Sequence, residues 1–109
     1  MSNAPLPLEI DCHGLRTVQV KNAKYAVIDV RMPHEVVHAP AGDSVNIPLN
    51  HLPQHLDRLP NDVEHLVIVC AHGQRSMVAT QWLRQNGFHN AQSLAGGMAS
   101  WRRFEAMAA

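Results

Sequence analysis

Two apolar runs of strand length stand out in the pattern of hydrophobic and polar positions. Residues 25–30 (Tyr-Ala-Val-Ile-Asp-Val) and residues 66–70 (Leu-Val-Ile-Val-Cys) contain almost no polar side chains. Runs without polar alternation are typical of parallel strands that are buried on both faces. We therefore expect both runs to be buried strands of a mostly parallel sheet.

Shorter segments with the spacing of strands and helices fill the rest of the chain. Short strands are predicted at residues 8–11, 45–47 and 91–94, and helices at residues 14–22, 33–38, 75–86 and after Gly96-Gly97. Leu52, Leu56 and Leu59 predict a further helix, with Pro53 in its first turn, where a missing N–H costs nothing. This alternation predicts an α/β fold, in which helices flank both faces of a central, mostly parallel sheet.

Length and composition restrict the classes of function. A chain of 109 residues has the size of one domain, which we expect to span residues 8–109 behind a flexible segment at residues 1–7. Nine basic and nine acidic residues give no net charge, so no nucleic-acid partner is expected. No apolar run approaches the roughly 20 residues of a membrane span, and no secretory leader is visible. These features predict a cytoplasmic protein without a membrane partner.

One of the two cysteines lies where α/β sheets bind ligands. Cys70 ends the more apolar run, and such sheets bind ligands beyond the carboxyl ends of their strands. The residues that lead from it into the next helix are Ala71, His72, Gly73, Gln74, Arg75 and Ser76. A loop wrapped over a helix N-terminus directs backbone N–H groups at an anion, here the Cys70 thiolate. With Arg75 and a protonated His72, these groups are expected to lower the pKa of Cys70; the alternative is a buried structural cysteine.

The loop from Cys70 to Ser76 resembles the active-site loop of the rhodanese family, the single-domain sulfurtransferases. Further motifs of the family are matched in the same order: residues 27–31 with Glu35, residues 46–49, and residues 94–97 with Trp101. The resemblance implies a single rhodanese-like domain with sulfurtransferase activity. Residues 39–44 depart from the Gly-His-Ile stretch usual in the family, and we expect a reshaped loop there with the chemistry retained.

The resemblance also implies a mechanism. Cys70 is the nucleophile that takes a sulfane sulfur from a small donor such as thiosulfate and becomes a persulfide. The loop residues Ala71 to Ser76 bind the sulfur, with no metal and no other cofactor. The acceptor is cyanide, a small thiol or a protein thiol. Four residues separate Cys70 from Arg75, as in the sulfurtransferase-like members, whereas the related phosphatases have five.

Charged residues near this loop have more than one candidate role. Arg75 either contacts the substrate or braces the loop. His72 is expected to point outward at the rim. Arg31 is expected to pair with Glu35 and to pin the first helix after the strand to the sheet.

Two further features of the chain bear on the thiol loop. Gly96 and Gly97 are expected to let the backbone pass close to it. Cys12 is either an ordinary cysteine or a resolving thiol for Cys70.

Two alternatives come from different functional classes. His34, Glu35 and His38 fit the H-E-x-x-H pattern of zinc hydrolases, in which the glutamate is the general base. Pro40 is expected to end that helix near Ala39, and no third ligand follows at a suitable spacing, so we expect surface histidines. The other alternative is a non-enzymatic rhodanese-fold module that binds a partner or relays a persulfide. The presence of Cys70 in an intact loop favours the enzyme.

Overall fold

The central strands carry the two apolar runs. The structure, a computed structural model, describes residues 6–108 of the chain. In it β2 (Tyr25–Asp29) and β4 (His65–Val69) pair in parallel along their whole length, with Ile28 opposite Ile68. The strand order is β1-β5-β4-β2-β3, which places β4 in the middle of a five-stranded sheet. The predicted parallel pairing is therefore confirmed. Residues 66–69 of β4 are buried as expected, but in β2 only Ile28 and Asp29 are buried, and Tyr25 at its start is exposed.

The outer strands are short and also run parallel to their neighbours. β5 (Ala91–Leu94) pairs with β4, and β1 (Glu9–Ile10) pairs with β5 at one edge. β3 (Val45–Asn46) pairs with β2 at the other edge. Because the strands are parallel, their carboxyl ends meet at one edge of the sheet, where the residues that follow β1, β4 and β5 lie together.

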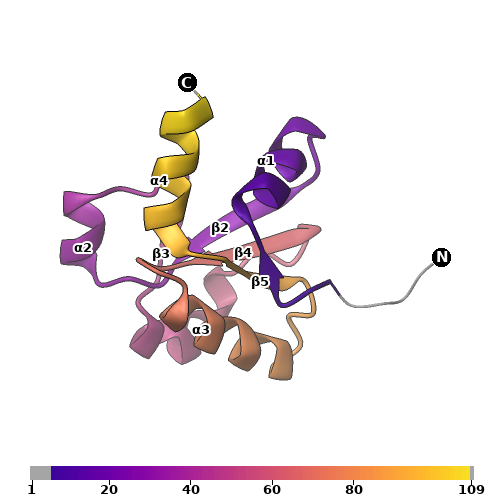
Figure 1. The fold of residues 1–109 in the computed structure, drawn as a ribbon. Helices are drawn as coiled ribbons and strands as arrows, with labels where there is room; N and C mark the ends of the chain where they lie inside the picture. Colours follow the sequence, from indigo (N-terminus) through magenta and orange to yellow (C-terminus); the bar gives the residue numbers. More distant parts are fainter. Residues whose placement is uncertain (1–5, 109) are drawn as a thin grey trace.

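Helices cover both faces of the sheet, as predicted. On one face lie α1 (Cys12–Val20) and α4 (Gly97–Ala108); on the other lie α3 (Gln74–Gln85) and the 3-10 helix η1 (Leu49–Arg58) (Figure 1). The short α2 (Pro33–His38) lies beside the sheet, beyond the end of β2.

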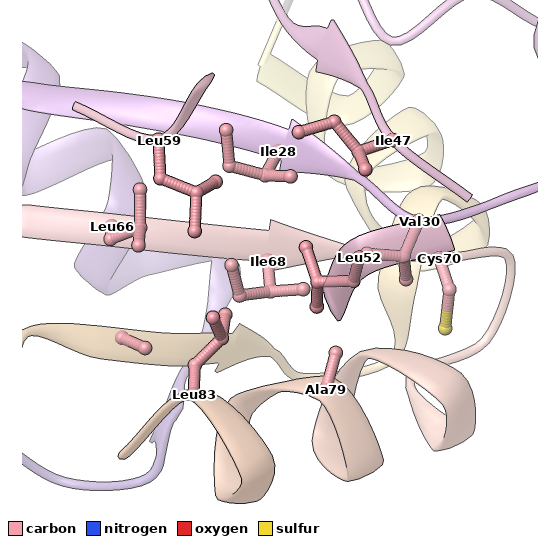
Figure 2. Packing of buried hydrophobic residues seen from close by; sticks show 11 residues of the cluster. Ile28, Val30, Ile47, Leu52, Leu59, Leu66, Ile68, Cys70, Ala79 and Leu83 are labelled. Carbon is pink, nitrogen blue, oxygen red and sulfur yellow. The ribbon is translucent and has the colours of Figure 1, made fainter. Parts of the chain in front are cut away.

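The alternation of side chains along β4 fills one core on each face. Leu66 and Ile68 belong to the cluster that packs against α3 and η1, and Val67 and Val69 belong to the cluster under α1 and α4. Figure 2 shows the first cluster running along β2 and β4, with Cys70 at its end near the first turn of α3. Cys70 thus lies directly after β4 and packs against the end of this cluster.

The helix predicted around Leu52, Leu56 and Leu59 differs from expectation. It is a 3-10 helix that begins at Leu49, and Pro53 lies inside it rather than in its first turn. Proline has no N–H, so Pro53 cannot make the backbone bond that an α-helix requires at that position. The backbone is non-helical at His55, with φ of −127° and ψ of 26°, which accommodates this break.

The expected flexible segment at residues 1–7 lies mostly outside the described residues. At its inner end, the Arg84 guanidinium donates to the carbonyls of Leu6 and Pro7 at 2.7 and 2.9 Å. Within residues 6–108, no helix has the length and apolar character to cross a membrane.

Candidate active site

Cys70 lies directly beyond β4 with its sulfur enclosed by the loop that follows. The residue is 1% exposed. Its Sγ accepts hydrogen bonds from the Gly73 amide at 3.0 Å and from the Ser76 amide at 3.3 Å, and the Ser76 hydroxyl lies 3.4 Å away. These amides belong to the N-cap and the first turn of α3, where helix N–H groups have no partner within the helix. The sulfur occupies the anion site that the sequence predicts.

Gly73 gives the loop its curvature. It is the N-cap of α3 and has a φ of 103°, a conformation that residues with a side chain rarely adopt. A β-carbon there would also lie 3.3 Å from the amide nitrogen of Gly96. The glycine therefore allows the Gly73 amide to point back at the Cys70 sulfur.

The start of α4 is hydrogen-bonded to the backbone of the thiol loop. The amides of Met98 and Ala99 donate to the carbonyls of Cys70 and Ala71 at 2.8 and 3.1 Å. A β-carbon on Gly97 would lie 2.5 Å from the Cys70 carbonyl oxygen, well inside van der Waals contact. The predicted close approach of this turn to the thiol loop is confirmed.

Hydrogen bonds, more than charges, control the ionisation of Cys70. Burial raises the pKa of the thiol, but bonds from the Ser76 hydroxyl and from the amides of Ser76, Gly73 and His72 more than offset burial, so the pKa lies below its ordinary value. The direction agrees with the sequence prediction. The cause differs in part, because that prediction also relied on the positive charges of Arg75 and His72.

The ion pairs around the loop correct one prediction. Glu35 pairs with Arg75 and not with Arg31: two bonds of 2.8 Å join the carboxylate to the Arg75 guanidinium. Arg31 is 3% exposed and instead donates to both carboxylate oxygens of the buried Asp29, at 2.7 to 3.1 Å. The reason is geometric, because Asp29 lies two residues away on the same strand end and satisfies Arg31 in a bidentate manner.

The Arg31 guanidinium also holds the stretch that departs from the family pattern. Its Nη2 donates to the Ala39 carbonyl at 2.7 Å, and the Arg102 guanidinium on α4 donates to the same oxygen at 3.2 Å. The backbone then turns through Gly42, whose φ is 74°. Residues 39–44 thus form a loop fixed at its start, and none of the hydrogen bonds to Cys70 comes from it.

The remaining predicted site residues lie at different depths around the sulfur. Ser76 is fully buried, Ala71 and Arg75 are half-buried, and His72 and Gln74 are exposed at the rim. The outward position predicted for the His72 side chain is confirmed. The Arg75 guanidinium bonds Glu35 rather than the sulfur, so its contact is one that braces the loop against α2.

One polar side chain behind the sulfur escaped sequence reasoning. Ser93 on β5 is fully buried, and its hydroxyl lies 2.7 Å from the Ser76 hydroxyl. Ser93 belongs to a short strand in which all four residues are buried, and the sequence shows only a serine within that predicted strand. Such a serine needs a hydrogen-bonding partner, but the sequence alone does not identify it.

The structure argues against the zinc alternative, because Glu35, its expected general base, is held in an ion pair. His34 and His38 are exposed on α2, and Glu35 between them is held by Arg75 and by the Met32 amide. The bond to Arg75, followed by that to Met32, lowers the pKa of Glu35 to about 2. Across residues 6–108, no cluster of three His, Cys, Asp or Glu side chains has metal-binding geometry.

Comparison with known proteins establishes the family. Residues 17–104 match the family described as the rhodanese-like domain, and the chain therefore belongs to it. It is 30% identical over 95 residues to a sulfurtransferase of Allochromatium vinosum, covering 87% of this chain and 88% of that protein. It is 31% identical over 84 residues to the thiosulfate sulfurtransferase GlpE of Stutzerimonas stutzeri, covering 76% of this chain and 75% of that protein.

Solved structures and longer relatives extend the comparison. A rhodanese-related protein from Thermoplasma volcanium superposes with a TM-score of 0.78 and 33% identity, over 90% of this chain and 93% of that one. The chain also matches longer proteins named adenylyltransferase and sulfurtransferase, including one from Arabidopsis thaliana, and spans 21% to 25% of their length. The relatives named here support a transferase role for the chain.

Proposed function

We propose that this chain moves a sulfane sulfur from a small donor such as thiosulfate to a thiophilic acceptor through a persulfide on Cys70. The observation that carries the proposal is the ring of donors around the Cys70 sulfur, from Gly73, Ser76 and the His72 amide. A sulfur held in this way reacts as a thiolate, the form that attacks other sulfur atoms. The name of the thiosulfate sulfurtransferase relative supports thiosulfate as the donor.

In the first half-reaction the Cys70 thiolate attacks the outer sulfur of thiosulfate. A bond forms between Sγ and that sulfur as the bond to the sulfonate group breaks, and sulfite leaves with the electron pair. The product is a persulfide anion, so no proton has to be supplied. The amides of Gln74 and Arg75 open α3, where the carbonyls of the helix cannot reach them, and they are suited to receive the negative terminal sulfur.

In the second half-reaction the acceptor attacks the terminal sulfur. With cyanide, a carbon–sulfur bond forms, the sulfur–sulfur bond breaks, and thiocyanate leaves while Cys70 returns to the thiolate. With a thiolate acceptor, the same displacement gives an acceptor persulfide. The longer relatives combine sulfurtransferase with adenylyltransferase in their names, which favours an acceptor protein over cyanide as the physiological acceptor.

The ion pairs argue for a pocket suited to one sulfur atom rather than to a phosphate. Arg75 is paired with Glu35 through two 2.8 Å bonds and makes no hydrogen bond to the Cys70 sulfur within the described residues. A phosphatase needs an arginine that faces the anion and binds two of its oxygens. The four-residue spacing from Cys70 to Arg75 agrees with this assignment.

The test is thiosulfate:cyanide sulfur transfer by Cys70→Ser, with Cys12→Ser as the matched control. Both residues are buried free cysteines, so the two variants change the same chemical group. Transfer is expected to fall to the uncatalysed background in Cys70→Ser and to remain at the wild-type rate in Cys12→Ser. Wild-type transfer by Cys70→Ser would refute the proposal, as would a folded wild-type protein that transfers no sulfur from thiosulfate.

A further inference from the structure

Two buried hydroxyl groups form a chain behind the Cys70 sulfur. The Ser76 hydroxyl lies 3.4 Å from Cys70 Sγ, and the Ser93 hydroxyl lies 2.7 Å from Ser76 Oγ. Both serines are fully buried, on α3 and on β5. Neither serine is exposed to bulk water, and within residues 6–108 the side-chain hydrogen bonds of the two hydroxyls are those to each other and to Cys70 Sγ.

The direction of the hydrogens depends on the state of the sulfur. A thiolate or a persulfide sulfur can only accept, so the Ser76 hydrogen points at Cys70, and the Ser93 hydrogen then points at Ser76 Oγ. In this direction both hydroxyl hydrogens have an acceptor. In the opposite direction Ser76 donates to Ser93, and the Ser93 hydrogen needs another acceptor. Among residues 6–108, the only side-chain hydrogen bond of Ser93 is the one to Ser76.

We propose that Ser93 is a positioning residue for sulfur transfer: its hydroxyl donates to Ser76 Oγ and so turns the Ser76 hydroxyl hydrogen toward the reacting sulfur of Cys70. Burying a hydroxyl hydrogen without an acceptor is unfavourable, which is why one direction of the chain is preferred. The proposal rests on the proposed function, because it takes Cys70 as the reacting group. Ser93 itself touches neither the sulfur nor the substrate.

The charged residues near the loop are paired with each other, so they are separate from the two hydroxyl groups. Arg75 is paired with Glu35, and Asp29 is paired with Arg31. Neither serine changes its charge with pH. A change in Cys70 ionisation on removal of the Ser93 hydroxyl would therefore come from the hydrogen bonds.

The chain offers a matched control for loss of a buried hydroxyl. Thr80 lies one turn after Ser76 on α3 and is fully buried, and among residues 6–108 its hydroxyl has no hydrogen-bond partner. Thr80→Val removes that hydroxyl at nearly constant volume. It tests whether deleting any buried hydroxyl next to the site has the same effect.

The experiment is a pH titration of the Cys70 thiolate by ultraviolet absorbance, in the Cys12→Ser background so that one thiol remains. Ser93→Ala is expected to raise the titration midpoint and to lower the thiolate fraction on the acidic side roughly three- to tenfold, the range of one hydrogen bond. The acidic limb of kcat/KM should move with it. Thr80→Val should leave both unchanged.

The decisive comparison adds Ser76→Ala. If Ser93 acts through Ser76, Ser93→Ala produces no further shift once the Ser76 hydroxyl is absent, a non-additivity that marks direct coupling. An unchanged midpoint in Ser93→Ala, an equal shift in Thr80→Val, or additive shifts in the double variant would overturn the role of Ser93. The titration uses neither donor nor acceptor, so its outcome is independent of whether Cys70→Ser abolishes sulfur transfer.

Discussion

Cys70 and Cys12 are two free, buried thiols near the same edge of the sheet, and their pKa values are shifted in opposite directions. Each follows a strand at the carboxyl edge of the sheet, β4 and β1, and they are 1% and 9% exposed. Burial raises the pKa of both thiols. At Cys12 burial and the charge of Asp11 leave the pKa raised, with a smaller opposing effect of Arg103, whereas at Cys70 hydrogen bonds reverse the direction.

The N-cap residue of the helix next to each thiol differs: α1 begins at Cys12 itself, and α3 begins four residues after Cys70. At α1 the N-cap is Asp11, whose carboxylate accepts the Gly14 amide at 2.7 Å. Asp11 thus satisfies one free N–H of that helix end, and its negative charge raises the pKa of the neighbouring Cys12 thiol. At α3 the N-cap is Gly73, which has no side chain, and the sulfur itself takes the amides. The two helix N-termini therefore differ because the amides of one bond a carboxylate and those of the other bond the Cys70 sulfur.

Among substitutions that keep both thiols, the largest effect is expected from Gly97→Ala, which should disturb the hydrogen bonds around Cys70. The new β-carbon would lie 2.5 Å from the Cys70 carbonyl oxygen, so the loop must shift. Misplacement by about 1 Å at a reacting centre can cost roughly a hundredfold in rate, and we expect a loss of that order in sulfur transfer. The assay is thiosulfate:cyanide transfer, with folding checked by circular dichroism.

Gly87→Ala is the matched control for that substitution. Gly87 also has a positive φ, 94°, but nothing lies within 4 Å of its added β-carbon. Both variants therefore carry backbone strain, and only Gly97→Ala disturbs the loop. Equal activity losses in the two variants would show that contact with the loop is unimportant.

A second prediction compares the two thiols directly. Cys12→Ser leaves Cys70 as the single thiol, and Cys70→Ser leaves Cys12. The pKa measured by thiolate absorbance should lie below the ordinary cysteine value for Cys70 and above it for Cys12, because the hydrogen bonds to Cys70 outweigh its burial. Sulfur transfer should decline as pH falls through the Cys70 value. Coinciding titrations would remove the basis of the comparison.

The smallest effect is expected from Glu35→Gln, which leaves the hydrogen bonds to the Cys70 sulfur in place. The pKa of Glu35 is lowered from 4.5 to about 2, chiefly by its bond to Arg75, so the ion pair stabilises the fold above pH 4.5 and is lost as pH falls toward 2. Because the pair is partly exposed, we expect a contribution of about 1 kcal/mol or less.

Urea unfolding at neutral and acidic pH measures this contribution. Wild type should lose its advantage over Glu35→Gln in the acidic range, while the titration of Cys70 should stay close to that of wild type. A constant difference across pH would contradict the ion-pair account. A large displacement of the Cys70 titration would show that the charge of Arg75, rather than the loop amides, controls the thiolate.

Local patterns in the sequence were sufficient for the sheet and the thiol loop. The apolar runs that became β2 and β4 cannot satisfy a helical pattern of exposure, and a cysteine followed by a glycine-containing loop and a helix predicts an anion site. The ion-pair partner of Glu35, by contrast, could not be predicted from local patterns. Glu35 is four residues from Arg31 but forty from Arg75, and only the fold reveals that Asp29 already occupies Arg31.

Two further features depended on contacts that are distant in sequence. The hydrogen bond between Ser76 and Ser93 joins α3 to β5, and the sequence alone does not indicate which residue bonds a serine in an apolar strand. The 3-10 helix around Pro53 begins after Pro48, where the Leu49 amide donates to the Val30 carbonyl at 3.1 Å. That tertiary bond places the start of the helix, and the leucine spacing alone could not.

The central claim is that Cys70, and not Cys12, carries the transferred sulfur. Its most direct test is the intact mass of the protein after incubation with thiosulfate and removal of excess donor. Wild type and Cys12→Ser should each gain the mass of one sulfur atom and lose it again on addition of cyanide, and Cys70→Ser should gain nothing. A cyanide-sensitive sulfur on Cys70→Ser, or none on wild type, would contradict the account.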